Sequence, residues 1–353
     1  MKYSNRLFLL FGIALWTGSV QAQSNGSLQS AVSLDLLGQF GEPFESQGGK
    51  VEPREAEIIL FAPVDSLWDG FLNLAAHQEQ GQAYFEIHEA YLSSSRWLPH
   101  SQVRIGQYFL QLGRLNQFHR HDWPFISAPM VQRSFFDNEG ANDSGVEWSF
   151  LFPTDHYLNL TIGITSGWRF GHSHSLGEKP NVPTTYARLS SYSDLWSNGG
   201  TQYGLNTLIR EDASGNQTTL LGADLTAKWR SGRTLDWLIQ GEIWAKSFST
   251  PSSSEWSLGS YLFTQYGVSQ QVHLGLRLES LGNLSLKDAF GTPLANTEYA
   301  IVPTLTYKYS EFSTFRAAYS MVFERDPGEN FQPRQFLELQ STFIIGAHPA
   351  HDF

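Results

Sequence analysis

The chain has 353 residues, and its 34 aspartates and glutamates outnumber its 23 lysines and arginines, so the formal net charge is −11 at pH 7. This acidic balance argues against nucleic acid as a partner, because a polyphosphate binds basic surfaces. It weakly favours cations or neutral solutes. Cysteine is absent, so disulfides contribute nothing to stability.

Residues 1–22 have the pattern of a secretory signal peptide. Lys2 and Arg6 provide a positive start, an apolar run follows from Leu7 to Trp16, and small residues form the cleavage site. The apolar run is too short to cross a bilayer as a helix, which takes about 20 residues. We therefore expect an exported mature chain, residues 23–353.

The mature chain alternates apolar and polar residues, which predicts β-strands, because successive side chains of a strand point to opposite faces. The clearest segments are 221–230, 272–279 and 315–324. In the first, leucines lie on one face, and Asp224 and Lys228 lie on the other. An apolar face opposite a charged face is typical of a transmembrane barrel with an aqueous lumen.

We predict an all-β fold, a single closed antiparallel transmembrane barrel of about sixteen strands with no plug domain and both chain ends periplasmic. Every long loop falls on one side, as in outer-membrane barrels. The alternative is a soluble β-sandwich, whose strands alternate in the same way. Pro303 cannot donate to a neighbouring strand, so we expect a bulge or a strand start there. The predicted strands span residues 27–40, 54–64, 68–78, 82–95, 101–113, 144–153, 156–169, 183–196, 200–212, 216–230, 233–248, 253–268, 271–282, 296–310, 313–326 and 333–346.

The third connection on the long-loop side, residues 115–143, is unusually long and aromatic. We expect it to fold into the lumen as a constriction, with Trp123, Phe125 and Phe136 packed on the barrel wall. Imidazoles in such a pore would titrate near pH 6.5 unless their surroundings shift them. The alternative is a loop that projects outward as a lid or an oligomer contact. The residues expected to line the pore are Arg104, Arg114, His119, Arg120, His121, Asp122 and Arg188.

Two histidine pairs are candidate metal ligands. His119 and His121 are two residues apart, and His172 and His174 repeat that spacing in the next long loop. Imidazoles on the same side of an extended segment can chelate a metal such as zinc. The alternative is that these are ordinary hydrogen-bonded loop histidines. No other cofactor is expected.

Several runs of the chain resemble one group of bacterial proteins. These runs are Arg54–Glu57, Ile87–Leu92, Arg104–Gln107, Phe109–Asn116, His119–Phe125 with Pro129, and Ile345–Phe353. They resemble uncharacterised outer-membrane barrels that are similar to the phosphate-selective porins, and some members of that group carry the label zinc-regulated TonB-dependent receptor. The resemblance spans most of the mature chain. It implies a porin-like barrel in the outer membrane of a Gram-negative bacterium.

The function predicted from these features is a channel for passive diffusion of small hydrophilic solutes. The runner-up is a ligand-binding or zinc-linked receptor without a plug. The lysine-rich rings of the phosphate-selective porins have no counterpart in this sequence, so phosphate selectivity is not implied. No motif brings a nucleophile, a base and an orienting acid together, so an enzyme is not expected.

The expected partners follow from the same interpretation. They are outer-membrane lipid, small hydrophilic solutes and the barrel-assembly machinery, which in similar proteins recognises a final aromatic residue such as Phe353. The sequence leaves open whether several copies of the chain assemble into a homo-oligomer.

Overall fold

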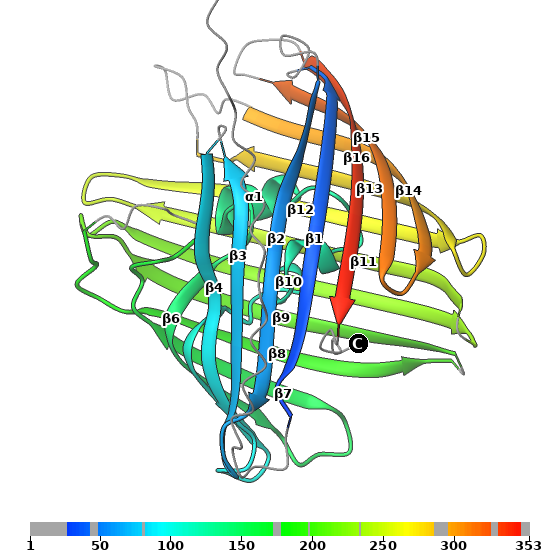
Figure 1. Cartoon of the computed structure of the whole chain (residues 1–353). Helices are drawn as coiled ribbons and strands as arrows, with labels where there is room; N and C mark the ends of the chain where they lie inside the picture. Colours follow the sequence, from blue (N-terminus) through cyan, green and yellow to red (C-terminus); the bar gives the residue numbers. More distant parts are fainter. Residues whose placement is uncertain are drawn as a thin grey trace, which may run out of the picture.

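A computed structural model of the chain describes residues 27–42, 49–79, 82–171, 178–196, 198–232, 234–285, 296–325 and 331–346. They form a closed barrel of sixteen antiparallel strands (Figure 1), which confirms the predicted fold class. The strands are β1 (Gln29–Gly41), β2 (Lys50–Pro63), β3 (Asp69–Glu79), β4 (Gln82–Ser94), β5 (Ser101–Phe109), β6 (Asn142–Leu151), β7 (Leu158–Thr165), β8 (Thr184–Leu195), β9 (Gly199–Glu211), β10 (Gln217–Ser231), β11 (Thr234–Ser249), β12 (Ser254–Gly267), β13 (Val272–Asn283), β14 (Asn296–Ser310), β15 (Ser313–Arg325) and β16 (Gln332–Gly346).

Each strand pairs with its neighbours in the sequence, and β1 pairs with β16 to close the sheet. In that closing pair Ala31 lies opposite Gly346, so the start of β1 and the end of β16 lie at the same rim. Closure matters because an open edge in lipid would leave backbone donors and acceptors unpaired, each at a cost of several kcal/mol.

Side chains alternate between the two faces of the wall. In β10, Leu221 and Leu225 on the outer face are 50% and 43% exposed, whereas Asp224 and Thr226 on the inner face are 5% and 1% exposed. The outer face is therefore apolar and the inner face polar, as the sequence pattern predicted. This arrangement is that of a barrel with a wet interior in a membrane.

The loops also follow the predicted order. The strand ends that flank the long connections between β1 and β2, β5 and β6, β7 and β8, and β13 and β14 all lie at one rim, and short turns such as residues 310–313 between β14 and β15 lie at the other. No helix in the described residues is long and apolar enough to cross a membrane.

One strand is shorter than predicted and one is more regular. β5 ends at Phe109 rather than at residue 113. The apolar alternation of the sequence continues at Leu110 and Leu112, but both side chains are fully buried in a hydrophobic cluster inside the barrel, so this part of the chain has already left the wall.

The expectation for Pro303 is wrong. β14 runs through this proline with no register shift on either side of it, and the irregularity with β15 lies at Lys308 instead.

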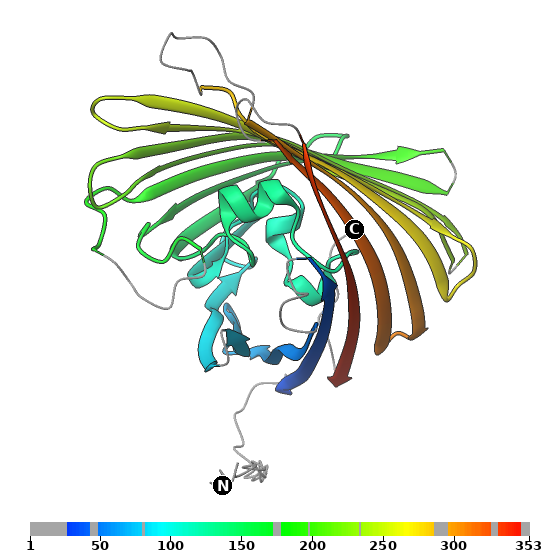
Figure 2. The ribbon, with the colours of Figure 1, turned by 90° about the horizontal axis from the view of Figure 1, so that it is seen from above.

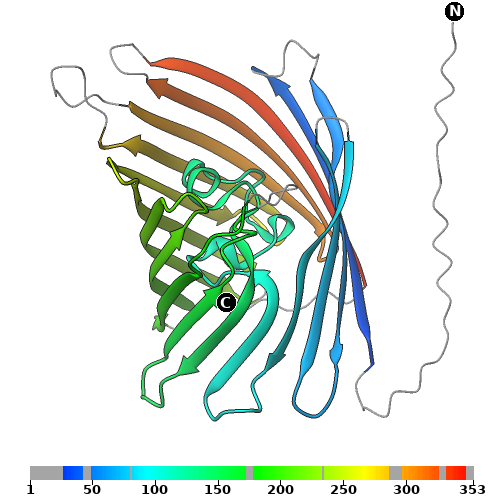
Figure 3. The same ribbon diagram turned by 90° about the vertical axis from the view of Figure 1, so that its left-hand side faces the viewer.

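Residues 110–141 occupy the lumen, and we call them the lumen loop. They contain two short 3-10 helices, η2 (Leu115–Gln117) and η3 (Arg120–Asp122), and one α-helix, α1 (Met130–Phe136). Views along and across the barrel show these helices inside the ring of strands (Figures 2 and 3). The predicted signal peptide, His172, His174 and Phe353 lie outside the described residues.

Candidate functional site

The lumen loop is anchored by aromatic side chains. Phe125 is 1% exposed and packs edge-on against Tyr261 and Phe263 of β12, at ring-centroid distances of 5.8 Å and 5.2 Å. Phe136 packs against Trp244 of β11 at 4.7 Å. A buried aromatic side chain removes about 150–250 Å² from water, which stabilises the packed loop by about 4–6 kcal/mol at 25 cal/mol per Å². The predicted folding of this loop against the inner wall is confirmed.

Phe125→Ala should destabilise the folded chain by about 3–5 kcal/mol, the usual cost of truncating a fully buried phenylalanine. The measurement is urea unfolding of the protein in detergent micelles, followed by tryptophan fluorescence. Phe85→Ala is the matched control, because that ring is 83% exposed. An equal loss of unfolding free energy in both variants would contradict the anchoring role of Phe125.

Polar side chains of the wall bind the backbone of the lumen loop. Glu242 accepts hydrogen bonds from the amides of Arg114 (3.1 Å) and Leu115 (2.7 Å). Asn206 accepts one from Gly113 (2.9 Å). Gly113 has a φ of +60°, and a side chain there would collide with the Glu242 carboxylate. These bonds satisfy backbone donors that the barrel wall shields from water.

Two β-bulges turn extra charged side chains toward the lumen loop. Arg54 is the extra residue in the register between β1 and β2, and His88 is the extra residue between β3 and β4. A bulge allows two consecutive side chains to face the same way. Arg54 and Glu55 are therefore both buried inside the barrel, and so are His88 and Glu89.

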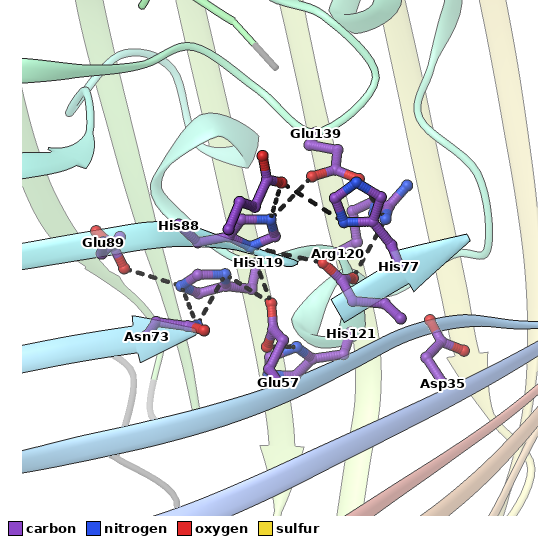
Figure 4. A network of polar contacts seen from close by, with 12 residues as sticks. Asp35, Glu57, Asn73, His77, His88, Glu89, His119, Arg120, His121 and Glu139 are labelled. Atoms are coloured by element: carbon purple, nitrogen blue, oxygen red, sulfur yellow. Dashed lines mark hydrogen bonds and ion pairs between the residues drawn. The ribbon is translucent and has the colours of Figure 1, made fainter. Parts of the chain in front are cut away.

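Part of the lumen loop packs against this region and forms a histidine–carboxylate cluster with it (Figure 4). The loop contributes residues 119–121 and Glu139, and the wall contributes side chains of strands β2, β3 and β4. The cluster consists of Glu55, Glu57, His77, Glu86, His88, Glu89, His119, Arg120, His121 and Glu139.

Glu57 is the centre of the cluster and is 1% exposed. Its Oε1 atom lies 3.1 Å from His119 Nδ1 and 3.4 Å from His88 Nδ1, and its Oε2 atom lies 2.8 Å from His121 Nδ1. On the far side of the His119 ring, Nε2 lies 2.8 Å from Glu89 Oε2. Each loop imidazole is thus held between carboxylates of the wall or of the loop itself.

The surroundings of these loop histidines shift their pKa values away from the usual 6.5, which is the exception that the sequence analysis allowed. Burial by itself lowers the pKa of His119, but Glu57 and Glu89 outweigh burial and raise that pKa to about 10. Burial likewise lowers the pKa of His121, and Asp122 and Glu57 raise it well above its usual value.

The structure divides the predicted pore residues into two groups. Arg104, Arg114 and Arg188 line a cavity of about 810 Å³ between the lumen loop and the wall formed by β5 to β9. Within the described residues, the lining of this cavity contains no aspartate or glutamate. Its other side chains are mostly serine, glutamine and aromatic residues.

The other four predicted pore residues do not line that cavity. His119 and His121 are 8% and 4% exposed and face the acidic wall of β2 and β4, and Arg120 forms ion pairs with Glu55 and Glu139. Asp122 contacts His121 at 3.2 Å. The reason is electrostatic, because the basic residues of the loop are attracted to buried carboxylates of the wall. These carboxylates are distant from the loop in the sequence, so the spacing of residues did not indicate the contact.

Two of the three lining arginines are also structural. Arg188 forms two hydrogen bonds with Asp224, and Arg104 donates to Glu147 at 2.8 Å. Such pairs brace the wall, as expected for most charges of the lumen: Arg104 and Glu147 join the neighbouring strands β5 and β6, and Arg188 on β8 reaches across β9 to Asp224 on β10. Arg114 belongs to the loop and donates to Gln202 at 2.8 Å. Its guanidinium also lies over the ring of Phe118, 4.4 Å from the ring centroid.

Three groups of side chains place nitrogen and carboxylate ligand atoms within 4.8 Å of one another in the described residues. Two of the histidines in these groups, His77 and His88, come from the wall and were not among the predicted metal ligands. Of those that were, His119 is in one group and His121 contacts its carboxylate. The groups are Glu57, His88 and His119; His77, Glu86 and His88; and Glu55, His88 and Glu139.

Comparison with models of known protein families finds no match. An uncharacterised protein of Aquifex aeolicus (strain VF5) is 28% identical over 350 residues, which cover 89% of this chain and 72% of that protein.

Solved porin structures share the fold. OmpT of Vibrio cholerae, in a form lacking loop L8, superposes with a TM-score of 0.62 at 10% identity, covering 91% of this chain and 100% of that one. An anion-selective porin from Comamonas acidovorans gives the same four values. The outer-membrane channel DcaP of Acinetobacter baumannii gives 0.61 at 12% identity, covering 91% and 97%. The chain therefore has the fold of the porins of bacterial outer membranes.

Proposed function

We propose that the protein is an outer-membrane channel for passive diffusion of small hydrophilic solutes. The observation that carries this proposal is the cavity of about 810 Å³ between the lumen loop and the wall, with its polar and arginine-bearing lining. A barrel of this strand number encloses an aqueous lumen, and a loop folded inside it narrows the passage without filling it. The shared fold with solved porins supports the same function.

We further propose that the channel prefers anions. The cavity lining carries Arg104, Arg114 and Arg188 without an acidic residue among its described members. Lys228 lies within electrostatic range of Arg114, and Lys308 of Arg316, on the inner faces of β10, β14 and β15. Arg104 and Arg188 are paired with Glu147 and Asp224, so the positive field that we propose near the passage comes mainly from the basic residues on these inner faces, although the whole chain is acidic. This proposal replaces the preference for cations or neutral solutes expected from net charge.

Reconstitution of the mature protein into a planar lipid bilayer tests the function. A channel gives stepwise conductance in potassium chloride, with a reversal potential in a salt gradient that reports anion preference. A barrel that inserts, resists protease and never conducts would refute the channel. It would favour the runner-up, a ligand-binding receptor, for which the histidine–carboxylate cluster is the supporting feature.

A further inference from the structure

We propose that Glu57, His88 and His119 bind one divalent transition-metal ion, with zinc the best match, which links the lumen loop to the barrel wall. Glu57 Oε1 lies 3.1 Å from His119 Nδ1 and 3.4 Å from His88 Nδ1. Ligand atoms bound tetrahedrally at about 2.0–2.1 Å from zinc lie about 3.3 Å apart. Two of the three separations are therefore close to those of zinc ligands, and all three residues offer ligand atoms within 4.8 Å of one another. A fourth position would be taken by water.

The outer nitrogens of both histidines are held by carboxylates. His119 Nε2 lies 2.8 Å from Glu89 Oε2. His88 Nε2 lies 3.0 Å from Glu86 Oε1 and 3.3 Å from Glu139 Oε2. When the ion binds, it would displace the proton of each Nδ1, while the carboxylate at the outer nitrogen keeps the proton of Nε2 in place. This is the usual outer shell of a histidine-bound zinc ion.

The Glu57 carboxylate points to the same conclusion independently. It is 1% exposed, and neither oxygen accepts a hydrogen bond of normal geometry from the described residues, although three imidazoles lie within 3.4 Å. A buried carboxylate needs polar partners of good geometry as well as nearby opposite charge. A metal ion at Oε1 would supply such a partner, and His121 Nδ1 lies 2.8 Å from Oε2.

The site joins three parts of the chain that are distant in sequence. Glu57 comes from β2, His88 from the bulge of β4 and His119 from the loop segment that precedes η3. A bound ion would therefore act as a staple for the lumen loop. The proposal does not depend on the channel function, because a metal ion can bind whether or not the barrel conducts.

Metal binding is measured on the mature chain, purified without a histidine tag, stripped with a chelator and dialysed. After zinc chloride is added and free ion removed by gel filtration, we expect about one zinc ion per chain. Cobalt(II) should give the visible absorption of a tetrahedral site. Less than half an equivalent of zinc in the wild-type protein would overturn the proposal.

Variants locate the ion. Glu57→Gln and His119→Ala should each weaken zinc binding at least 100-fold, and Glu89→Gln should weaken it about 10- to 100-fold through the outer shell. His273→Ala is the control, because this histidine is also buried at the inner wall, on β13, and is in none of the three groups. Heat-modifiable mobility on gels checks that each variant is folded.

Two results would contradict this assignment. If Glu57→Gln and His119→Ala bind zinc as tightly as the wild-type protein, the ion is bound elsewhere. If His77→Ala abolishes binding and His119→Ala does not, the metal belongs to the group formed by His77, Glu86 and His88 instead.

Discussion

Replacing residues 118–138 with a six-residue glycine–serine linker should raise the single-channel conductance by roughly twofold or more. These residues carry the aromatic anchors and α1, which occupy the lumen. Without them the interior of a sixteen-stranded barrel is an open aqueous channel. The base of the loop should survive, because Asn116 accepts a hydrogen bond from the amide of Ala141 and donates to the carbonyl of Leu110.

Single-channel recording in a planar bilayer measures this effect. The control places the same linker in the turn at residues 212–216, which connects β9 to β10 outside the lumen. That variant should conduct like the wild-type protein. A lumen-loop variant with unchanged or smaller unitary conductance would show that the loop does not set the width of the passage.

The double variant Lys228→Glu and Lys308→Glu should shift the ion preference strongly toward cations. Both lysines lie on the inner face near the rim of short turns, in a basic region with Arg114, Arg230 and Arg316. A unit charge about 6 Å from the ion path in water changes the energy of a permeating ion by about 0.7 kcal/mol. Each reversal changes two unit charges, which raises the energy of an anion and lowers that of a cation by about 1.4 kcal/mol each, so the anion-to-cation permeability ratio should fall by up to about 100-fold per site, less at high salt.

The reversal potential in a potassium chloride gradient reports that ratio. Lys179→Glu is the matched control, since it makes the same change of charge at an exposed position in the loop between β7 and β8. It should leave the ratio nearly unchanged. If the double variant and the control behave alike, the basic inner rim does not select the permeating ion.

The wall of the barrel could be predicted from short stretches of sequence, because each strand and each turn is determined mainly by residues close together in the chain. A strand between lipid and water must alternate with a period of two, and the turns between strands are marked by glycine, proline, aspartate and asparagine. β14 occupies the predicted range of residues 296–310, and most other strands differ from prediction by a few residues at most. β5 is an exception. The apolar alternation predicts a strand that continues past Phe109, but Leu110 packs in a hydrophobic cluster inside the lumen.

The candidate metal site could be predicted only in part. The spacing of His119 and His121 indicated a loop that could chelate, but their partners come from the wall. One signal was present in the sequence: the consecutive polar pairs Arg54-Glu55 and His88-Glu89 break the alternation. Each pair marks a β-bulge, and each bulge directs a second polar side chain inward.

The sequence by itself determined the barrel, the sides of its loops and the burial of the aromatic lumen loop, because alternation, turn residues and apolar loop composition act over short distances. Only the tertiary structure decided where the loop's charged residues lie. Glu57 and His119 are far apart in the chain, and their 3.1 Å approach depends on strand register, two bulges and the docking of the loop. The attraction between buried charges is strong but acts through space, so no sequence spacing encodes it.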